Sequence, residues 1–320
     1  MKIAFASLVG IEPMPFPDLL QKASALGLTG VEVNVGPGFR RVGTPDAPGH
    51  LDLRAIVRDG PGATHELLAR HGMEIVALAP MLNLLTADAT LRAERIAYLR
   101  LTIEACAALG VRTVVTYAGS AFGMYFWGLP AVGPNHPSNH LAENLRLYAE
   151  IFTPLAEYAE AHGVKIAFET AARGGGEGNL AHSPELWDRL FAAVPSEALG
   201  LSFDPSHLVW LHVPNIPDVI RAYGPRIYHM DGKDAEILPA QLAKQGILGN
   251  GWWRYRLPGL GACDWTAIFS ALGDVGYDGA VSIENEDPLC LGLAGAAWSA
   301  DYLRARLLPL SAQSEERGAR

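Results

Sequence analysis

The sequence predicts a single (β/α)8 TIM barrel, an α/β fold in which parallel strands alternate with helices. Eight short apolar runs alternate with eight longer segments of helical spacing along nearly the whole chain. Several of the runs are apolar without alternation, as is typical of strands that are covered on both faces. The 320 residues suit one such barrel, since barrels of this kind run to about 250 residues or more.

The predicted strands are short and rich in β-branched or other apolar residues. They cover 2–7 (KIAFAS), 30–35 (GVEVNV), 74–80 (EIVALAP), 112–118 (RTVVTYA), 164–170 (VKIAFET), 199–204 (LGLSFD), 226–231 (RIYHMD) and 279–285 (GAVSIEN). The predicted helices have apolar residues at helical spacing. They cover 17–26, 62–72, 88–109, 138–162, 184–193, 216–223, 264–275 and 294–308. Glycine separates several helices from the next strand, where a left-handed, helix-ending residue belongs. These glycines are Gly72, Gly110, Gly163 and Gly276.

The connections that lead from a strand to the next helix are the long ones. They are 36–61, 119–137, 171–183 and above all 232–263. Because the active sites of barrels are built from these loops, we expect the chemistry at the C-terminal ends of the strands. We predict one catalytic domain over residues 1–310. The small polar segment 311–320 is expected to be a frayed tail.

Charge and cysteine content exclude several classes of protein. The net charge is −9 and the basic residues form no run, so a nucleic-acid partner is not expected. The three cysteines, Cys106, Cys263 and Cys290, suggest neither a disulfide framework nor a thiolate zinc site. They are expected to be buried as small hydrophobic residues. With no signal-peptide pattern and no apolar run of about 20 residues, the protein is expected to be cytoplasmic, without a membrane partner.

Four polar residues stand at or next to the ends of the last four predicted strands. They are Glu169, Asp204, His229 and Glu284. Alone, Asp204 before Pro205 is equally compatible with a turn, and His229 with a core histidine. A barrel would bring the four together, and three carboxylates with one imidazole suit a divalent metal ion. We expect one such ion, Mn²⁺ first and Zn²⁺ second, with Mg²⁺ and Co²⁺ also compatible.

This metal set indicates proton transfer next to a carbonyl. A divalent ion polarises the carbonyl and an adjacent hydroxyl of a bound sugar, which lowers the barrier to removing the proton between them. Glu169 and Glu284, on roughly opposite walls, could then exchange that proton as an acid/base pair.

The motifs around these residues resemble the sugar phosphate isomerase/epimerase family of xylose isomerase-like barrels, a superfamily that includes ketose 3-epimerases, inosose dehydratases and endonuclease IV. The motifs are E169-T, F203-D-P-S-H207, Y228-H-M-D-G-K-D234 and S282-I-E-N285. The resemblance implies that the four residues bind the metal and that Glu169 and Glu284 are catalytic. It also implies a substrate contact by His207.

The chain departs from the family pattern at two places, which affect the expected substrate contacts and the expected number of metal ions. Relatives often carry His-x-His-x-Lys-Asp where this chain has Asp231 in place of the second histidine, followed by Lys233. We retain Asp231 and Lys233 as candidate substrate-binding residues. The predicted ends of strands 2 to 4 read NVGPG, LAPMLN and TYAGS, without histidine, which favours one metal over a trinuclear zinc cluster.

Several loop residues are candidates for binding a sugar or polyol. The 232–263 connection carries Trp252, Trp253 and Arg254, which offer apolar faces and hydrogen-bond donors, although the tryptophans could equally pack the loop. The 119–137 connection is also rich in aromatic residues, and Glu177 lies in a glycine-rich stretch where it could reach hydroxyl groups. The chain has neither a P-loop nor a dinucleotide fingerprint, so no nucleotide cofactor is expected.

The sequence therefore predicts a metal-dependent sugar isomerase or epimerase that acts through a metal-bound enediolate. The alternative is a metal-dependent lyase that eliminates a β-leaving group from keto-inositols or 3-oxo-glycosides. A minor alternative is a non-catalytic sugar-binding barrel. The sequence leaves the substrate open, and a homo-oligomer remains possible.

Overall fold

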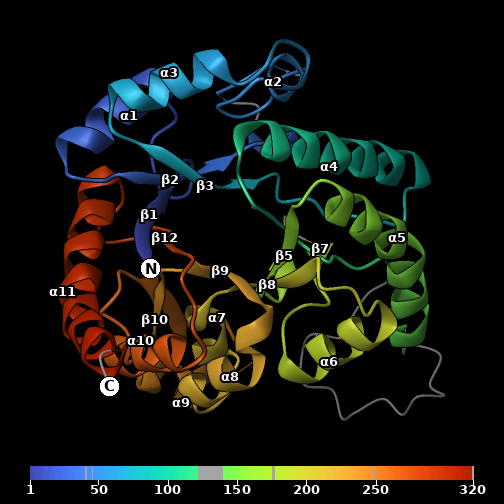
Figure 1. Cartoon of the computed structure of the whole chain (residues 1–320). Helices are drawn as coiled ribbons and strands as arrows, with labels where there is room; N and C mark the ends of the chain where they lie inside the picture. Colours follow the sequence, from blue (N-terminus) through green and yellow to red (C-terminus); the bar gives the residue numbers. More distant parts are fainter. Residues whose placement is uncertain (40–41, 45, 122–139, 175–176, 248, 319–320) are drawn as a thin grey trace. The chain divides into compact units, whose positions relative to one another are not determined.

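A computed structural model describes residues 1–39, 42–44, 46–121, 140–174, 177–247 and 249–318 (Figure 1). Eight parallel strands form a closed barrel in the order β1-β12-β9-β8-β5-β4-β3-β2, which confirms the predicted fold class. The strands are β1 (Lys2–Ala6), β2 (Gly30–Asn34), β3 (Glu74–Ala79), β4 (Thr113–Thr116), β5 (Lys165–Glu169), β8 (Leu199–Phe203), β9 (Ile227–Asp231) and β12 (Ala280–Ile283). Each lies within one of the predicted strands.

All eight predicted helices are present, with three that the sequence reading left inside loops. The predicted ones are α1 (Phe16–Ala25), α3 (Gly62–Arg70), α4 (Ala89–Leu109), α5 (Leu141–Ala161), α6 (Pro184–Ala193), α8 (Ile216–Tyr223), α10 (Trp265–Asp274) and α11 (Leu293–Gly318). The additional ones are α2 (Leu53–Asp59), α7 (Pro205–Trp210) and α9 (Pro239–Gln245). Aspartate side chains begin several helices by accepting backbone N–H groups, as Asp52, Asp88 and Asp264 do.

Two of the long connections that follow barrel strands contain short β-hairpins. Within 232–263, strands β10 (Asp234–Ile237) and β11 (Trp253–Arg256) pair in antiparallel fashion, with α9 between them. Within 171–183, β6 (Arg173–Gly174) and β7 (Glu177–Gly178) form a second small hairpin. The aromatic residues of 119–137 that begin at Phe122 lie outside the described residues.

The chain divides into two compact units. Unit 1 comprises Met1–Glu32, Leu67–Val76 and Phe203–Arg320, and unit 2 comprises Val33–Glu66 and Ala77–Ser202. In unit 1, β1 pairs with β12, β12 pairs with β9, and α11 packs beside β1 and β12 (Figure 1). In unit 2, β4 pairs with β5, which pairs with β8.

The cysteine, membrane and tail predictions have different outcomes. Cys106 and Cys263 are buried free thiols as expected, but Cys290 is exposed because it lies in the turn after β12, so its predicted burial is wrong. Among the described residues, no helix has the length and apolar character needed to cross a membrane. The backbone of α11 is helical through Gly318. The fraying of residues 311–320 stays a prediction. The single catalytic domain over residues 1–310 also stays a prediction.

Candidate active site

Asp204 is a fully buried carboxylate at the junction of β8 and α7. Pro205 occupies the first position of α7, and Asp204 caps the helix by accepting a 2.8 Å hydrogen bond from the backbone N–H of Ser206. This geometry confirms the turn that the Asp-Pro sequence suggested. It uses only Oδ1 and leaves Oδ2 for a second set of partners.

A buried lysine joins two of the predicted metal ligands. The Nζ atom of Lys233 lies 2.9 Å from Oδ2 of Asp204 and 2.6 Å from Oε2 of Glu284, and 3.7 Å from Glu286. It also stands 4.6 Å from the ring centroid of Tyr255. Because Lys233 is 2% exposed, these carboxylates compensate for the loss of water around its charge. The ammonium group is therefore shared by Asp204 and Glu284.

The two carboxyl groups have opposite pKa shifts. Burial alone would raise the pKa of Asp204, but His207 and the Lys233 ammonium outweigh it and hold that pKa well below its usual range. Burial raises the pKa of Glu284 to about 7, against the lowering effect of Lys233 and with a further contribution from Glu286. Burial opposes a charge on Lys233 as well, yet Asp204, Glu284 and Glu286 raise its pKa well above the ordinary value. Lys233 therefore carries a permanent positive charge, whereas Glu284 is poised to gain or lose a proton near neutral pH.

His207 supports Asp204, and both of its ring nitrogens have partners. Its Nε2 lies 2.9 Å from Oδ2 of Asp204, and its Nδ1 lies 3.3 Å from the indole nitrogen of Trp210 and 3.2 Å from the hydroxyl of Tyr255. An indole N–H only donates, so Nδ1 accepts, and in the neutral ring Nε2 carries the proton and faces Oδ2 of Asp204. These contacts hold the Asp204 carboxylate in place. They add nothing to the predicted substrate contact of His207, which stays a prediction.

A group of aromatic side chains extends from His207 to the β10–β11 hairpin through ring-to-ring contacts. Trp210 and Trp253 stack with ring centroids 4.7 Å apart, and Trp253 meets Tyr255 edge-on at 4.9 Å. Trp252, the sequence candidate, is 4% exposed, stacks on His212 and donates its indole N–H to the carbonyl of Ile247. Trp252 therefore packs the loop, which is the alternative that the sequence left open for the tryptophans. Trp253 is the one that continues the aromatic group.

Ion pairs join the two strands of this hairpin, and one of them also joins the hairpin to the loop after β12. Arg254 and Arg256 both contact Oε2 of Glu236, at 2.8 and 2.7 Å. Arg256 also donates to Oδ2 of Asp287 at 2.9 Å, as does the backbone N–H of Leu257 at 3.1 Å. The candidate substrate residue Arg254 thus has a structural partner, with its side chain still about one third exposed (34%).

We expect an Asp287→Asn variant to be destabilised at neutral pH. Burial raises the pKa of Asp287, but hydrogen bonds from the backbone of Leu289, from Arg256 and from the backbone of Leu257 lower it below its ordinary value. A lowered carboxyl pKa stabilises the fold above the unfolded-state pKa, and this contribution is lost as pH falls. Urea unfolding should show a loss of about 1–3 kcal/mol at pH 7 that shrinks below about pH 4. The exposed Asp301, changed to Asn, is the control; an equal loss at both pH values would contradict the argument.

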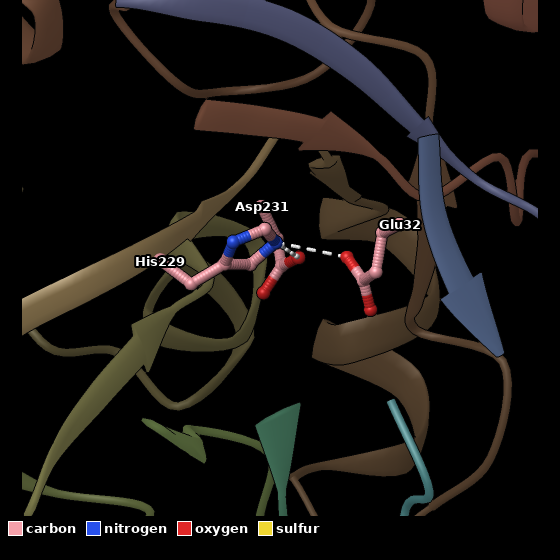
Figure 2. Close-up of side chains that lie close together, drawn as sticks. All are labelled: Glu32, His229 and Asp231. Atoms are coloured by element: carbon pink, nitrogen blue, oxygen red, sulfur yellow. Dashed lines mark hydrogen bonds and ion pairs between the residues drawn. The ribbon is translucent and has the colours of Figure 1, made fainter. Parts of the chain in front are cut away.

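His229 lies in a second buried cluster, which includes a residue that the sequence reading missed. Its Nε2 is 2.8 Å from Oε2 of Glu32, in β2, and 3.9 Å from Oδ1 of Asp231 (Figure 2). Glu32 and His229 are each 1% exposed, and so is Asp231. Figure 2 shows both carboxylates on the Nε2 side of the ring, with Nδ1 turned away from Glu32. A signal for Glu32 was present, since a carboxylate between Val31 and Val33 in an apolar strand requires a buried partner.

Glu169 belongs to unit 2, where it is the last residue of β5 and 3% exposed. The side chain of Asn179 donates to the backbone oxygens of Glu169 and Ala171, at 2.8 and 2.7 Å, and so fixes the chain where β5 ends. Glu177 lies in β7, where its backbone is in register with Gly174. The structure thus brings Asp204, His207, Lys233 and Glu284 together in unit 1 and joins His229 to Asp231 and Glu32.

Comparison with known proteins agrees with the observed fold. Residues 20–306 match the family described as xylose isomerase-like TIM barrel. The uncharacterized protein YfiH of Bacillus subtilis is 28% identical over 320 aligned residues, which cover 91% of this chain and 95% of YfiH.

Solved structures with the same architecture include a sugar epimerase and a protein with a bound zinc atom. An L-ribulose 3-epimerase has a TM-score of 0.64 at 19% identity, covering 100% of this chain and 97% of that chain. The IolI protein, solved with a zinc atom bound, has a TM-score of 0.64 at 22% identity, covering 95% of this chain and 96% of that chain. At these identities the likeness establishes the fold.

Proposed function

Because the chain belongs to the xylose isomerase-like TIM barrel family, we propose that it is a divalent-metal-dependent sugar isomerase or epimerase. The observation that carries the proposal is the convergence of two buried carboxylates, Asp204 and Glu284, on one cationic group. Buried carboxylates are costly unless a cation compensates them, so their arrangement serves cation binding. The fold likeness to L-ribulose 3-epimerase supports a sugar as the substrate class.

The side chains fit a divalent metal ion. Asp204 and Glu284 supply an anionic oxygen pair, and the Lys233 ammonium stands in for the cation. His229 can add an imidazole nitrogen, and Glu169 is proposed as the fourth ligand from its burial at the end of β5. This donor set suits Mn²⁺ or Zn²⁺, and the IolI structure with zinc supports the second. When bound, the ion would polarise a substrate carbonyl as a Lewis acid.

Side chains of the protein would transfer the proton, stabilise the developing negative charge and contact the sugar. Glu284, whose pKa burial raises to about 7 in the metal-free protein, is proposed to take a proton from a carbon next to the carbonyl and to return it. Glu169 is its proposed partner on the other face of the sugar. Lys233 remains charged and can donate to a developing oxyanion. Trp253 and Trp210 stack on each other, and an outer face of this pair is proposed to contact the C–H face of a sugar.

Hydrogen exchange with solvent tests this proposal. The protein loaded with Mn²⁺ and incubated with a panel of ketoses and inososes in D₂O should exchange one substrate C–H, and the metal-free protein should not. Products of unchanged mass, apart from deuterium, indicate isomerisation or epimerisation. Loss of water or of an aglycone would instead favour the lyase alternative, and the absence of exchange with every sugar would contradict the proposal.

A further inference from the structure

We infer that Glu32 is a positioning residue that fixes the orientation and tautomer of His229, so that Nδ1 presents its lone pair to the metal. This inference rests on the proposed role of His229 as a metal ligand. It adds a residue from β2, a strand that contributes none of the proposed ligands.

The cluster is built from three residues of unit 1. Glu32 is the central residue of β2, and His229 and Asp231 are alternate residues of β9. Alternate residues of a strand point to the same face, so both β9 side chains lie on the side of Glu32 (Figure 2). The 2.8 Å contact from His229 to Glu32 is a hydrogen bond, whereas the 3.9 Å separation from Asp231 is too long for one.

The partners decide which nitrogen of His229 carries the proton. Carboxylates are acceptors when ionised, and Nε2 faces two of them. Nε2 is therefore the donor, and in the neutral ring Nδ1 has the lone pair that a metal requires. Histidine ligands of metals commonly donate their second N–H to a carboxylate, which orients the ring and makes the ligand nitrogen more basic.

Burial makes the arrangement sensitive to the loss of Glu32. All three side chains are 1% exposed, so water cannot readily replace the missing carboxylate. A buried N–H without an acceptor costs about 1–3 kcal/mol, which the ring can avoid by changing tautomer or by turning toward Asp231, 3.9 Å away. Either change would take the Nδ1 lone pair away from the ion that His229 is proposed to bind, and the loss of such a supporting partner weakens metal binding by about 10–100-fold.

The experiment compares Glu32→Ala and Glu32→Gln with the wild type by two readouts. The first is Mn²⁺ affinity. The second is the ¹⁵N NMR tautomer of His229 in the metal-free protein, assigned with a His229→Gln variant. We expect an Nε2–H tautomer in the wild type and its loss in Glu32→Ala, together with a 10–100-fold weaker affinity. Glu32→Gln keeps an acceptor oxygen and should lose less. Glu74→Ala, which removes an exposed partner of Lys2, should leave both readouts unchanged.

Several outcomes would overturn the inference. These are an Nδ1–H or doubly protonated His229 in the wild type at neutral pH, and a Glu32→Ala variant with unchanged tautomer and affinity. A second bound Mn²⁺ that disappears in Glu32→Ala would make Glu32 a ligand instead. A wild type that binds no Mn²⁺ would contradict the proposed function, and the tautomer of the metal-free protein would still decide the role of Glu32.

Discussion

A Glu284→Gln variant should lose solvent exchange of the substrate C–H by about 10²–10⁴-fold, the usual contribution of a general acid or base. Glutamine keeps the size of the side chain and an oxygen, but it cannot take up a proton. Burial raises the pKa of Glu284 to about 7 in the metal-free protein, and a bound cation would favour the ionised form that accepts the proton. The measurement is the rate of deuterium incorporation at saturating Mn²⁺, which separates a loss of chemistry from a weaker affinity for metal.

Glu286 offers the matched control for this variant. It lies two residues further along the same loop, contacts the same lysine at 3.7 Å and is 39% exposed. Glu286→Gln should therefore retain most of the exchange rate. If Glu284→Gln exchanged as fast as the wild type at full metal occupancy, Glu284 would not be the proton-transfer group.

A Lys233→Met variant should be less stable without metal and should bind Mn²⁺ more tightly than the wild type. Removing one partner of a buried ion pair costs about 3–5 kcal/mol, because the remaining charges have lost their compensation. Asp204 and Glu284 would then lack the Lys233 ammonium, and a metal ion would meet no competitor for their oxygens. Saturating Mn²⁺ should thus stabilise the variant more than it stabilises the wild type.

Thermal unfolding with and without Mn²⁺, together with a metal titration, measures both effects. The exposed Lys244 of α9, changed to Met, controls for the loss of a positive charge. A Lys233→Met variant that bound Mn²⁺ more weakly would show that Lys233 supports the metal rather than competing with it.

The barrel was predictable because its signals are local. Apolar runs gave each strand, and glycines such as Gly110 and Gly163, which adopt positive φ, gave the helix ends. Helix α2 was missed, although Asp52 caps it, because its short segment was assigned to a long connection. The sequence also singled out Asp204 and Glu284, which directly follow β8 and β12, and His229, which is the central residue of β9 rather than its end. The metal-binding role of the three residues stays a prediction.

The partners of these residues were less accessible from the sequence. The ion pairs of Lys233 depend on side-chain rotamers and on strands far apart in the chain, which no spacing rule gives. Glu32 was not predicted because it lies in the middle of β2, away from the strand ends where barrel chemistry is expected. The sequence also left open whether Trp252 and Trp253 pack the loop, because it did not reveal that Trp252 is 4% exposed and stacks on His212.

The most direct test of the account is a crystal structure of the protein soaked with Mn²⁺, with anomalous diffraction data. The account predicts one anomalous peak within coordination distance of Asp204, His229 and Glu284, with the Lys233 ammonium moved out from between the two carboxylates. Crystals without a peak at full soaking concentration, with Lys233 still bridging Asp204 and Glu284, would contradict it.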